Sequence, residues 1–331
     1  MEPGLFTERL SRFMARILFI GIRYYAYTDR IIAEMEAQGH RVDYHPIEHV
    51  DFVSKTRKRY RPAAYAKRLS AYHRTVIAQA AGTAYDIVLM LQSHHFTRAD
   101  LLALKSSQST ARFILYNWDS LTTHDYRANL DLFDAAITFD PDDAAALGIN
   151  YLPLFALPEY FEVAQTAAPP RHDIYFVGSL HSMARFEAAE RLKSYCNAEG
   201  LRLKLYLHCS PPRMLDLLRR RKWLPGMTLR SVGTDAIIAM MRDARAVFDF
   251  ANHQQSGYTM RLVENMCAGK KIVTSNQRVL DEPFFSEDRF MLLGPELDLT
   301  GLKTFIERPF VSNPDLSAFS LASWTRRLLA H

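Results

Sequence analysis

Short apolar runs alternate with amphipathic segments along most of this chain. The run at 16–21 reads Arg-Ile-Leu-Phe-Ile-Gly and predicts a buried strand, the pattern at 28–38 predicts a helix that Gly39 ends, and 41–46 predicts a second strand. A strand, a helix and a second strand within about 30 residues form a βαβ unit, which implies a parallel sheet. The continuing pattern predicts strands at 85–91, 112–116 and 135–139, an extended piece at 151–154 and a helix at 98–105 capped by Thr97.

The alternation restarts after a proline-containing segment at 158–172, which we interpret as a linker. The second half predicts strands at 173–178, 201–208, 246–250 and 271–274, and helices at 182–198, 235–243 and 259–268. We therefore expect an α/β protein with two Rossmann-like domains facing a central cleft, at 1–160 and 161–315. The terminal segment 316–331 is predicted to be helical from 316 to 329, and the first domain is one candidate surface for its packing.

Composition places the chain among ordinary globular proteins. Its 331 residues suit two cores better than one, and 48% are hydrophobic and 23% charged. No apolar run approaches the roughly 18 residues of a membrane span, and residues 1–16 lack the apolar core of a signal peptide. Cys196, Cys209 and Cys267 lie far apart without metal-ligand spacing. We expect reduced thiols and a cytoplasmic location.

The net charge of +5 is concentrated in one segment, 55–74, which carries eight lysines and arginines and no acid. A solvated helix face is the plain interpretation. An anionic surface such as lipid headgroups or a lipid-diphosphate acceptor is the second, since Tyr60, Tyr65 and Tyr72 suit an interfacial position. Peripheral binding to the inner membrane face through 55–74 therefore stays open. Nucleic acid is not an expected partner, because the rest of the chain is near neutral and has no recognisable nucleic-acid motif.

Two predicted strands of the first half end in residues with acid–base chemistry. His94 and His95 follow the strand at 85–91. Adjacent histidines on a turn seldom bind one ion and no third ligand is evident, so we expect no metal. They are candidates for a general base or for binding sugar or phosphate, with a structural turn as the alternative. Asp119 follows the strand at 112–116 as a base for a sugar hydroxyl or as a helix N-cap. The acids at 140–143 predict a helix start.

The second half opens with a glycine turn between a strand and a helix. Gly178 and Ser179 end the strand at 173–178, and Arg185 lies in the first turn of the predicted helix. One interpretation is a plain turn with Ser182 as the N-cap. The other is a phosphate contact through backbone N–H groups, with Arg185 directed at the same charge.

The most informative segment is 255–276, which predicts a polar turn, a short helix, a glycine stop and a buried strand. The first N–H groups of the helix are unpaired and its end is positive, which suits the diphosphate of a nucleotide. Arg261 and Glu264 lie on one face of the helix, as a cation for phosphate and a carboxylate for ribose hydroxyls. The alternative is a solvent-facing ion pair. The donor-binding candidates are Gly178, Ser179, Arg185, Asn252, Gln255, Ser256, Gly257, Tyr258, Thr259, Arg261 and Glu264.

Several segments together resemble glycosyltransferases of the GT-B fold, and more narrowly the bacterial group-1-like enzymes of the CgeB type, which occur with capsule, lipopolysaccharide and spore-coat genes. The resemblance covers roughly 16–309. It is carried by the early βαβ unit, Phe113–Ser120, Ala135–Asp140, Phe176–Ser179 and above all Gln255–Asn276.

The resemblance implies that the second domain binds a nucleotide-sugar donor and the first holds the acceptor. Glu264 would contact the ribose, the turn at 256–259 the diphosphate, and Arg185 and Arg261 the leaving-group charge, without a metal or cofactor. Many retaining GT-B enzymes have a further glutamate eight positions earlier. Here that position is Ser256, which makes inversion by a first-domain base more plausible.

We therefore expect a glycosyltransferase that moves a sugar from a nucleotide-sugar donor to a surface-glycan or lipid-linked saccharide acceptor, with Asp119, His94 or His95 as the base. Two alternatives stay open. One is a nucleotide-sugar epimerase on the same fold, and the other is a catalytically inactive module that binds a glycan or nucleotide.

Overall fold

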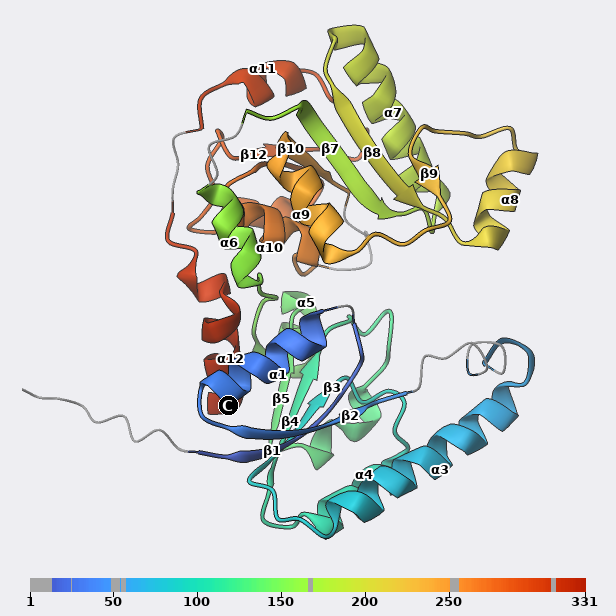
Figure 1. Cartoon of the computed structure of the whole chain (residues 1–331), viewed down its shortest axis with the longest axis vertical. Helices are drawn as coiled ribbons and strands as arrows, with labels where there is room; N and C mark the ends of the chain where they lie inside the picture. Colours follow the sequence, from blue (N-terminus) through green and yellow to red (C-terminus); the bar gives the residue numbers. More distant parts are fainter. Residues whose placement is uncertain are drawn as a thin grey trace, which may run out of the picture. The chain divides into compact units, whose positions relative to one another are not determined.

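The computed structural model describes residues 14–24, 26–48, 54, 58–165, 169–250, 256–310 and 314–331. The chain forms two compact units (Figure 1). Unit 1 contains the described residues up to Thr138, together with Leu147–Asn150 and Arg327–His331. Unit 2 contains Phe139–Ala146 and the described part of Tyr151–Arg326. Each unit has its own sheet and is described by itself.

Unit 1 is built on a six-stranded sheet in the order β2-β1-β3-β4-β5-β6. The central strand β1 pairs in parallel with β2 on one side and β3 on the other. The order reverses between β1 and β3, so the carboxyl ends of these strands form a topological switch point, where open α/β sheets bind ligands. The elements are β1 (Arg16–Gly21), α1 (Tyr27–Ala37), β2 (Arg41–Pro46), α3 (Pro62–Ala80), β3 (Ile87–Leu91), α4 (Arg98–Ser107), β4 (Arg112–Asn117), η1 (Arg127–Leu132), β5 (Ala135–Thr138) and β6 (Asn150–Tyr151).

Both faces of this sheet are covered by helices, which explains why its inner strands β1, β3 and β4 carry continuous apolar runs rather than an alternating pattern. Leu18 of β1 and Val88 of β3 belong to one core cluster with residues of α3 and α4. Ile31 of α1 is also buried. The Thr97 side chain accepts from the Asp100 backbone N–H, so the predicted N-cap of α4 is confirmed.

Unit 2 is built on a second six-stranded sheet in the order β12-β11-β10-β7-β8-β9. Strand β7 pairs in parallel with β10 and with β8, and the order reverses between β7 and β10. In chain order this is 3-2-1-4-5-6, the arrangement of a dinucleotide-binding Rossmann sheet. The elements are α5 (Pro141–Leu147), α6 (Pro158–Ala164), β7 (His172–Ser179), α7 (Met183–Glu199), β8 (Leu203–His208), α8 (Pro211–Arg219), β9 (Met227–Thr228), α9 (Thr234–Arg242), β10 (Ala244–Asp249), α10 (Met260–Cys267), β11 (Lys271–Thr274), η2 (Gln277–Asp281), β12 (Phe290–Leu292), α11 (Leu302–Glu307), η3 (Ser317–Phe319) and α12 (Leu321–Ala330).

Helices also cover both faces of the second sheet. Phe176 of β7, Phe248 of β10 and Phe186 of α7 share one core cluster. In Figure 1, α6, α9 and α10 lie together on the other side of the sheet, and α6 packs against both α9 and α10. The predicted α/β class with two parallel sheets is therefore confirmed, and each unit is Rossmann-like.

Several predicted boundaries need correction. The predicted linker at 158–172 contains the helix α6, whose Tyr160 and Val163 are buried. Pro158 is at the first helical position, where proline is favoured, so this proline begins a helix rather than breaking one. The terminal helix predicted at 316–329 is divided into η3 and α12. Helices α8 and α11 and strands β9 and β12 were missed because their apolar patterns are short.

Candidate functional site

The switch point of unit 2 brings Gly178 and Arg185 together. Gly178 lies near the end of β7, and Arg185 belongs to the first turn of α7. A Cβ atom on Gly178 would lie 2.6 Å from an Arg185 guanidinium nitrogen, so glycine makes room for this side chain. The guanidinium carbon lies 5.3 Å from the centre of the Phe176 ring, and its Nε has no hydrogen-bond partner among the described residues. Burial lowers the pKa of Arg185, and the nearby Asp249 opposes that shift.

Strand β10 ends at the same switch point with a buried carboxylate, Asp249. Thr259 and Thr274 donate their hydroxyls to it at 2.8 and 2.9 Å. The Thr259 oxygen also accepts from the Leu262 N–H at 3.0 Å and so caps α10. Burial raises the pKa of Asp249, although the threonine hydrogen bonds and the charges of Arg185 and Arg261 act in the opposite direction. Asp249 thus connects the end of β10 to the start of the predicted donor helix.

Arg261 and Glu264 form an ion pair on α10, as their spacing allows. The solvent-facing alternative is wrong for the carboxylate, because Glu264 is only 1% exposed. Two hydrogen bonds hold α10 against β7. The Tyr175 hydroxyl donates to the Asn265 side chain at 2.8 Å, and the Asn265 amide donates to the Arg261 carbonyl at 2.9 Å. We call Arg185, Asp249, Arg261 and Glu264 the switch-point cluster.

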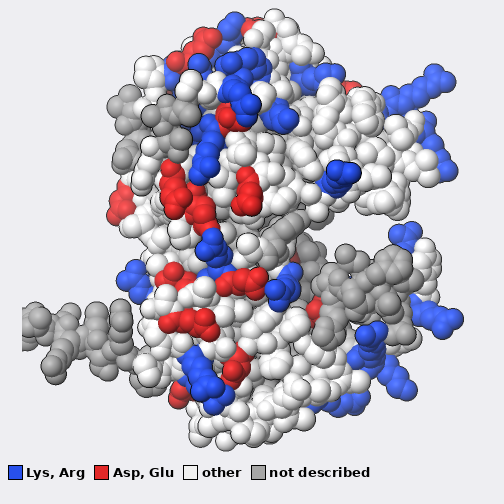
Figure 2. Space-filling model, in the orientation of Figure 1, with Lys and Arg blue, Asp and Glu red and all other residues white. Residues whose placement is uncertain are grey.

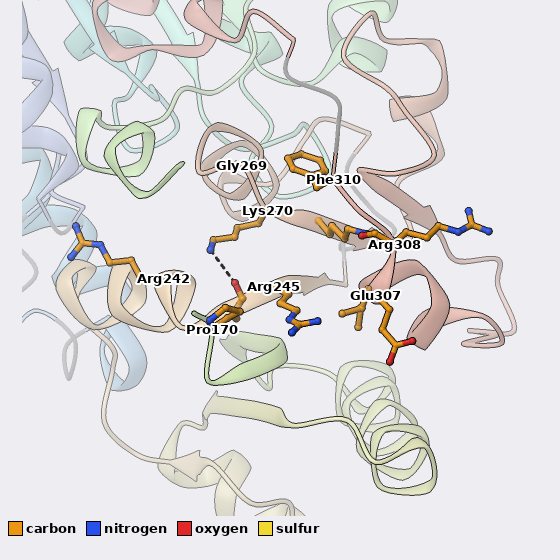
Figure 3. A pocket seen from close by; sticks show the side chains of 11 residues that line it. Pro170, Arg242, Arg245, Gly269, Lys270, Glu307, Arg308 and Phe310 are labelled. Carbon is orange, nitrogen blue, oxygen red and sulfur yellow. Dashed lines mark hydrogen bonds between the residues drawn. The ribbon is translucent and has the colours of Figure 1, made fainter. Parts of the chain in front are cut away.

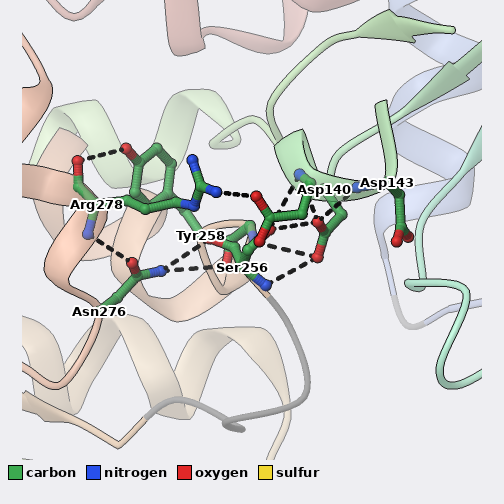
Figure 4. A network of polar contacts seen from close by, with 8 residues as sticks. Asp140, Asp143, Ser256, Tyr258, Asn276 and Arg278 are labelled. Carbon is green, nitrogen blue, oxygen red and sulfur yellow. Dashed lines mark hydrogen bonds and ion pairs between the residues drawn. The ribbon is translucent and has the colours of Figure 1, made fainter. Parts of the chain in front are cut away.

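The turn before α10 binds a carboxylate of the chain itself (Figure 4). Asp140 accepts from the backbone N–H groups of Ser256 and Gly257 at 2.9 and 3.3 Å, and from the Ser256 hydroxyl. It also accepts from the Asp142 N–H at 3.0 Å, at the helix start predicted for 140–143. Burial would raise the pKa of Asp140, but the hydrogen bonds from Ser256, Asp143 and Gly257 lower it. The N–H groups of Ser256 and Gly257, predicted to bind a diphosphate, therefore have an internal anionic partner.

Further contacts fix this turn from η2. The Asn276 amide donates to the Ser256 and Gly257 carbonyls at 3.4 and 3.3 Å. Arg278 forms an ion pair with Asp142. Tyr258, a predicted donor contact, is buried and donates its hydroxyl to Glu282 at 2.5 Å. In this conformation its hydroxyl therefore has a partner in unit 2.

The close packing of the turn gives a stability prediction. A Cβ atom on Gly257 would lie 2.7 Å from the Phe139 carbonyl oxygen, which is backbone and cannot rotate away. We expect Gly257→Ala to lower the free energy of unfolding by about 1–3 kcal/mol through overpacking. Gly294→Ala is the control, because its Cβ would have nothing within 4 Å. Urea unfolding measures both, and equal stabilities of the two variants would contradict this packing.

The switch point of unit 1 gathers three histidines. The rings of His94 and His124 are stacked with their centroids 3.7 Å apart, and the ring centroid of His95 lies 4.0 Å from that of His94. Asp119 lies 3.8 Å from the His124 Nε2 and accepts from the Gln92 amide. The three predicted catalytic residues are therefore neighbours. No helix begins directly after Asp119, so its alternative role as an N-cap is wrong.

The partly buried carboxylate of Glu48 orients one of these histidines. The His95 Nε2 lies 3.3 Å from it, Lys58 donates to it at 3.1 Å, and Tyr65 donates its hydroxyl. Burial alone would raise the pKa of Glu48, but hydrogen bonds from His95, Tyr65 and Lys58 hold it well below its usual range. The carboxylate is therefore available to select one tautomer of His95.

His94 differs in its titration. Burial, together with the charges of His95 and His124, lowers its pKa to about 3. Its Nδ1 has no hydrogen-bond partner among the described residues, and the same is true of the Ser93 hydroxyl and the Asn117 amide nitrogen. A histidine this weakly basic is a poor general base near neutral pH, because the best catalytic pKa lies near the working pH.

The low pKa of His94 predicts acid sensitivity. An unfolded histidine gains its proton below about pH 6.5, whereas His94 in the fold resists protonation until about pH 3. The unfolded state therefore binds more protons between these values, and stability falls as the pH is lowered through this window. We expect His94→Gln to shift the midpoint of acid unfolding to lower pH, measured by circular dichroism. Glu48, Lys58, His95 and His124 also act on the pKa of this ring, and an unchanged midpoint would contradict the contribution of His94 to acid unfolding.

Asn252, Gln255, Thr259 and Ser179 are further predicted donor-binding residues. Asn252 and Gln255 lie outside the described residues. Thr259 serves as the N-cap of α10, and Ser179 is exposed at the end of β7. Within the described ranges, no group of three or more His, Cys, Asp or Glu side chains is arranged to hold a metal ion. Cys196, Cys209 and Cys267 are buried and unpaired with one another.

The basic segment 55–74 lies largely on α3, and its residues 55–57 are outside the described part of the chain. Figure 2 shows lysine and arginine side chains along this helix. The interfacial interpretation of its tyrosines needs correction, because Tyr65 donates to Glu48 and Tyr72 donates to the Pro46 carbonyl at 2.8 Å. Tyr60 remains exposed, at 71%. Among the described residues, no helix combines the length and apolar character needed to cross a membrane.

Sequence reasoning missed several residues of both clusters. Asp249 has a readable signal, since an acid at the carboxyl end of a buried strand is unusual. Glu48 and His124 had weaker signals, because each lies in a loop some residues after a strand and reaches its partners only through the tertiary fold. Gln92 adopts a left-handed backbone with φ of 70°, a strained position for this residue type that only the structure reveals.

Comparisons with known proteins show the fold. No family model and no curated protein matches the sequence. An α,α-trehalose-6-phosphate synthase from Burkholderia multivorans aligns over 96% of both chains with a TM-score of 0.65 and 13% identity. The lipopolysaccharide outer core galactosyltransferase WaaB aligns over 95% of this chain and 98% of its own, with a TM-score of 0.56 and 14% identity. A UDP-GlcNAc 2-epimerase from Methanocaldococcus jannaschii aligns over 95% of this chain and 98% of its own, with a TM-score of 0.56 and 10% identity. At these identities the likeness is one of fold, that of GT-B glycosyltransferases and their relatives.

Proposed function

We propose that this protein is a glycosyltransferase that uses a nucleotide-sugar donor. The observation that carries the proposal is the switch-point cluster of unit 2. Two arginines and two carboxylates gather at the reversal of a sheet with Rossmann strand order, the place where such sheets bind nucleotides. GT-B transferases with the same fold support the reaction class.

The cluster divides into a part for the diphosphate and a part for the ribose. Arg185 and Arg261 would donate to the diphosphate, because guanidinium groups bind phosphate oxygens in a bidentate manner. Glu264 would accept from the ribose hydroxyls, while its ion pair with Arg261 fixes both side chains. Because Gly178 has no side chain, the Arg185 guanidinium can lie beside its backbone, and both would contact the donor. Asp140 holds the Ser256 turn that leads into the helix.

The departing nucleoside diphosphate needs charge stabilisation, and fixed cations supply it without a metal ion. Two arginines positioned before the reaction would neutralise charge as it develops on the leaving group. We therefore expect turnover to continue in the presence of a chelator. Loss of activity with EDTA, restored by magnesium, would contradict this part of the proposal.

The base that activates the acceptor hydroxyl would come from unit 1. His95 is the preferred candidate, because Glu48 bonds one ring nitrogen and leaves the other to take a proton. Asp119 is the second candidate, with its carboxylate partly exposed beside His124. His94 would act as a packing neighbour rather than as the base.

The acceptor would be a growing surface glycan or a lipid-linked saccharide, and transfer to it would take place at the cytoplasmic side of the membrane. The resemblance to CgeB-type enzymes and the named role of WaaB support it. The exposed cations of α3 would suit an anionic acceptor or membrane surface.

A thermal-shift panel tests the donor class directly. The protein is melted with UDP, GDP, dTDP, CDP or CMP, because a ligand that binds only the native state raises its melting temperature. We expect one diphosphate to dominate, and UDP is the first choice since the epimerase of the same fold acts on a UDP sugar. No shift with any nucleotide would overturn the proposal.

An epimerase is the second candidate, because one protein of the same fold is a UDP-GlcNAc 2-epimerase. Incubation with the donor alone distinguishes the two. An epimerase releases a new nucleotide sugar without any acceptor, whereas a transferase yields at most slow donor hydrolysis. Nucleotide binding with neither outcome, and no transfer to any acceptor, would indicate an inactive binding module.

A further inference from the structure

The amino-terminal edge of the second sheet carries a cavity of about 300 Å³ that is unrelated to the switch-point cluster (Figure 3). It is formed where β10 and β11 begin and where α9 and α11 end. Five of its lining residues are cationic and one, Glu307, is acidic. The cations are Arg242, Arg245, Lys270, Lys271 and Arg308. We call this cavity the basic pocket.

The cations of the basic pocket largely lack acidic partners. Within the described residues, Lys270, Lys271, Arg242 and Arg308 form no ion pair, and Arg245 reaches Asp173 only at 3.8 Å. Figure 3 shows Lys270 and Arg245 at the centre of the group, with Arg242 and Arg308 at its two sides. Like charges that line one pocket repel one another, and a bound anion reduces that repulsion. The lining therefore favours an anionic ligand.

Two lysines of the pocket differ in what they can offer a ligand. Lys271 donates to the Phe305 carbonyl and, at 2.8 Å, to the Arg308 carbonyl, so its amine holds α11 against the sheet. Lys270 donates to the Ala244 carbonyl at 2.9 Å, and an ammonium group carries three donors. Burial lowers the pKa of Lys270 to about 8, although the charge of Asp243 acts in the opposite direction.

The pocket is too far from the switch-point cluster to belong to it. Ala244 begins β10 and lines the pocket, whereas Asp249 ends the same strand in the cluster. Five residue steps along a strand separate the two by roughly 17 Å. A diphosphate bound at the cluster would not span this distance.

We propose that the basic pocket is a second binding site, which takes a phosphate-bearing ligand through Lys270 and Arg245. Phe310 lies on its wall, with its ring 4.8 Å from the Arg289 guanidinium, and adds an apolar surface for the organic part of such a ligand. The ligand would be a soluble phosphate ester or the phosphate of a lipid headgroup, which share this chemistry.

Calorimetry with inorganic pyrophosphate tests the site without any assay of activity. Lys270→Gln and Arg245→Gln are made singly and together, with Lys193→Gln on α7 as a charge-matched control. We expect the double variant to bind pyrophosphate at least tenfold more weakly at the basic pocket, so that only the site at the switch-point cluster remains, and the control to bind it as the wild type does. Arg261→Ala, in the switch-point cluster, should leave one pyrophosphate site intact. Thermal melting confirms that each variant is folded.

Unchanged pyrophosphate affinity in the folded double variant would overturn the proposal, and so would complete loss of binding in folded Arg261→Ala. Co-sedimentation with vesicles separates the two ligand sources. Binding to phosphatidic acid vesicles that pyrophosphate displaces supports a lipid headgroup at this site. Pyrophosphate binding without vesicle binding supports a soluble phosphate ester. Because no step requires a nucleotide sugar, failure here leaves the proposed transferase function unaffected.

Discussion

Replacing Arg261 with alanine is expected to weaken nucleotide binding strongly and to destabilise unit 2. The side chain would bind the diphosphate, and charge-assisted hydrogen bonds of this kind contribute about 1.5–3 kcal/mol, or roughly a 10- to 150-fold change in affinity. The same change removes the Arg261 side of an ion pair whose carboxylate, that of Glu264, is buried. Removing one member of a buried ion pair costs about 3–5 kcal/mol.

The two effects of Arg261→Ala are separated by a double variant. Arg261→Gln with Glu264→Gln replaces the ion pair by two amides of similar size, so neither member of the pair is left as a lone charge. We expect this variant to retain most of its stability and still to bind the nucleoside diphosphate of the thermal-shift panel at least tenfold more weakly. Stability is measured by urea unfolding and affinity by calorimetry.

Arg220→Ala is the matched control, since it breaks an arginine–aspartate pair on the exposed side of α8. Exposed pairs contribute about 0–1 kcal/mol, so stability should change little and nucleotide affinity not at all. If the folded double glutamine variant binds the nucleotide with wild-type affinity, the donor site is not at α10.

The sheets were predictable because buried parallel strands leave a strong signal. Continuous apolar runs such as 16–21 and 271–274 each correspond to an observed strand, β1 and β11. Glycines predicted where helices end, as Gly39 does for α1, because the left-handed backbone that often follows a helix favours glycine. The short strands β9 and β12 left no such signal, since two or three residues do not establish a period.

Candidate site residues were predictable only as far as strand ends determine position. Gly178, Arg185 and Arg261 follow strands of one sheet, and the fold does place them in one neighbourhood. The partner of the Ser256 turn was not predictable, because Asp140 is 116 residues earlier in the chain. A free helix end and one already bonded to a distant carboxylate have the same local sequence. Likewise, the Glu48–His95 pair depends on two different strand ends meeting.

Replacing His95 with asparagine is expected to lower kcat by about 10²–10⁴-fold, the usual contribution of a general base. Nucleotide affinity should stay unchanged, because the donor residues belong to unit 2. Glu48→Gln should also lower kcat, since an amide can donate to the ring nitrogen that the carboxylate now accepts from and so favour the wrong tautomer.

His45→Asn on β2 is the control for this experiment, as a histidine replacement in the same unit outside the histidine cluster. Asp119→Asn decides between the two candidate bases. If Asp119→Asn lowers kcat by the larger factor while His95→Asn changes it less than tenfold, Asp119 is the base and His95 is a positioning residue. If both variants turn over at the wild-type rate with normal donor affinity, the unit 1 cluster takes no part in proton transfer. The geometry favours His95, because its ring is held by Glu48, which Lys58 and Tyr65 keep ionised and in place.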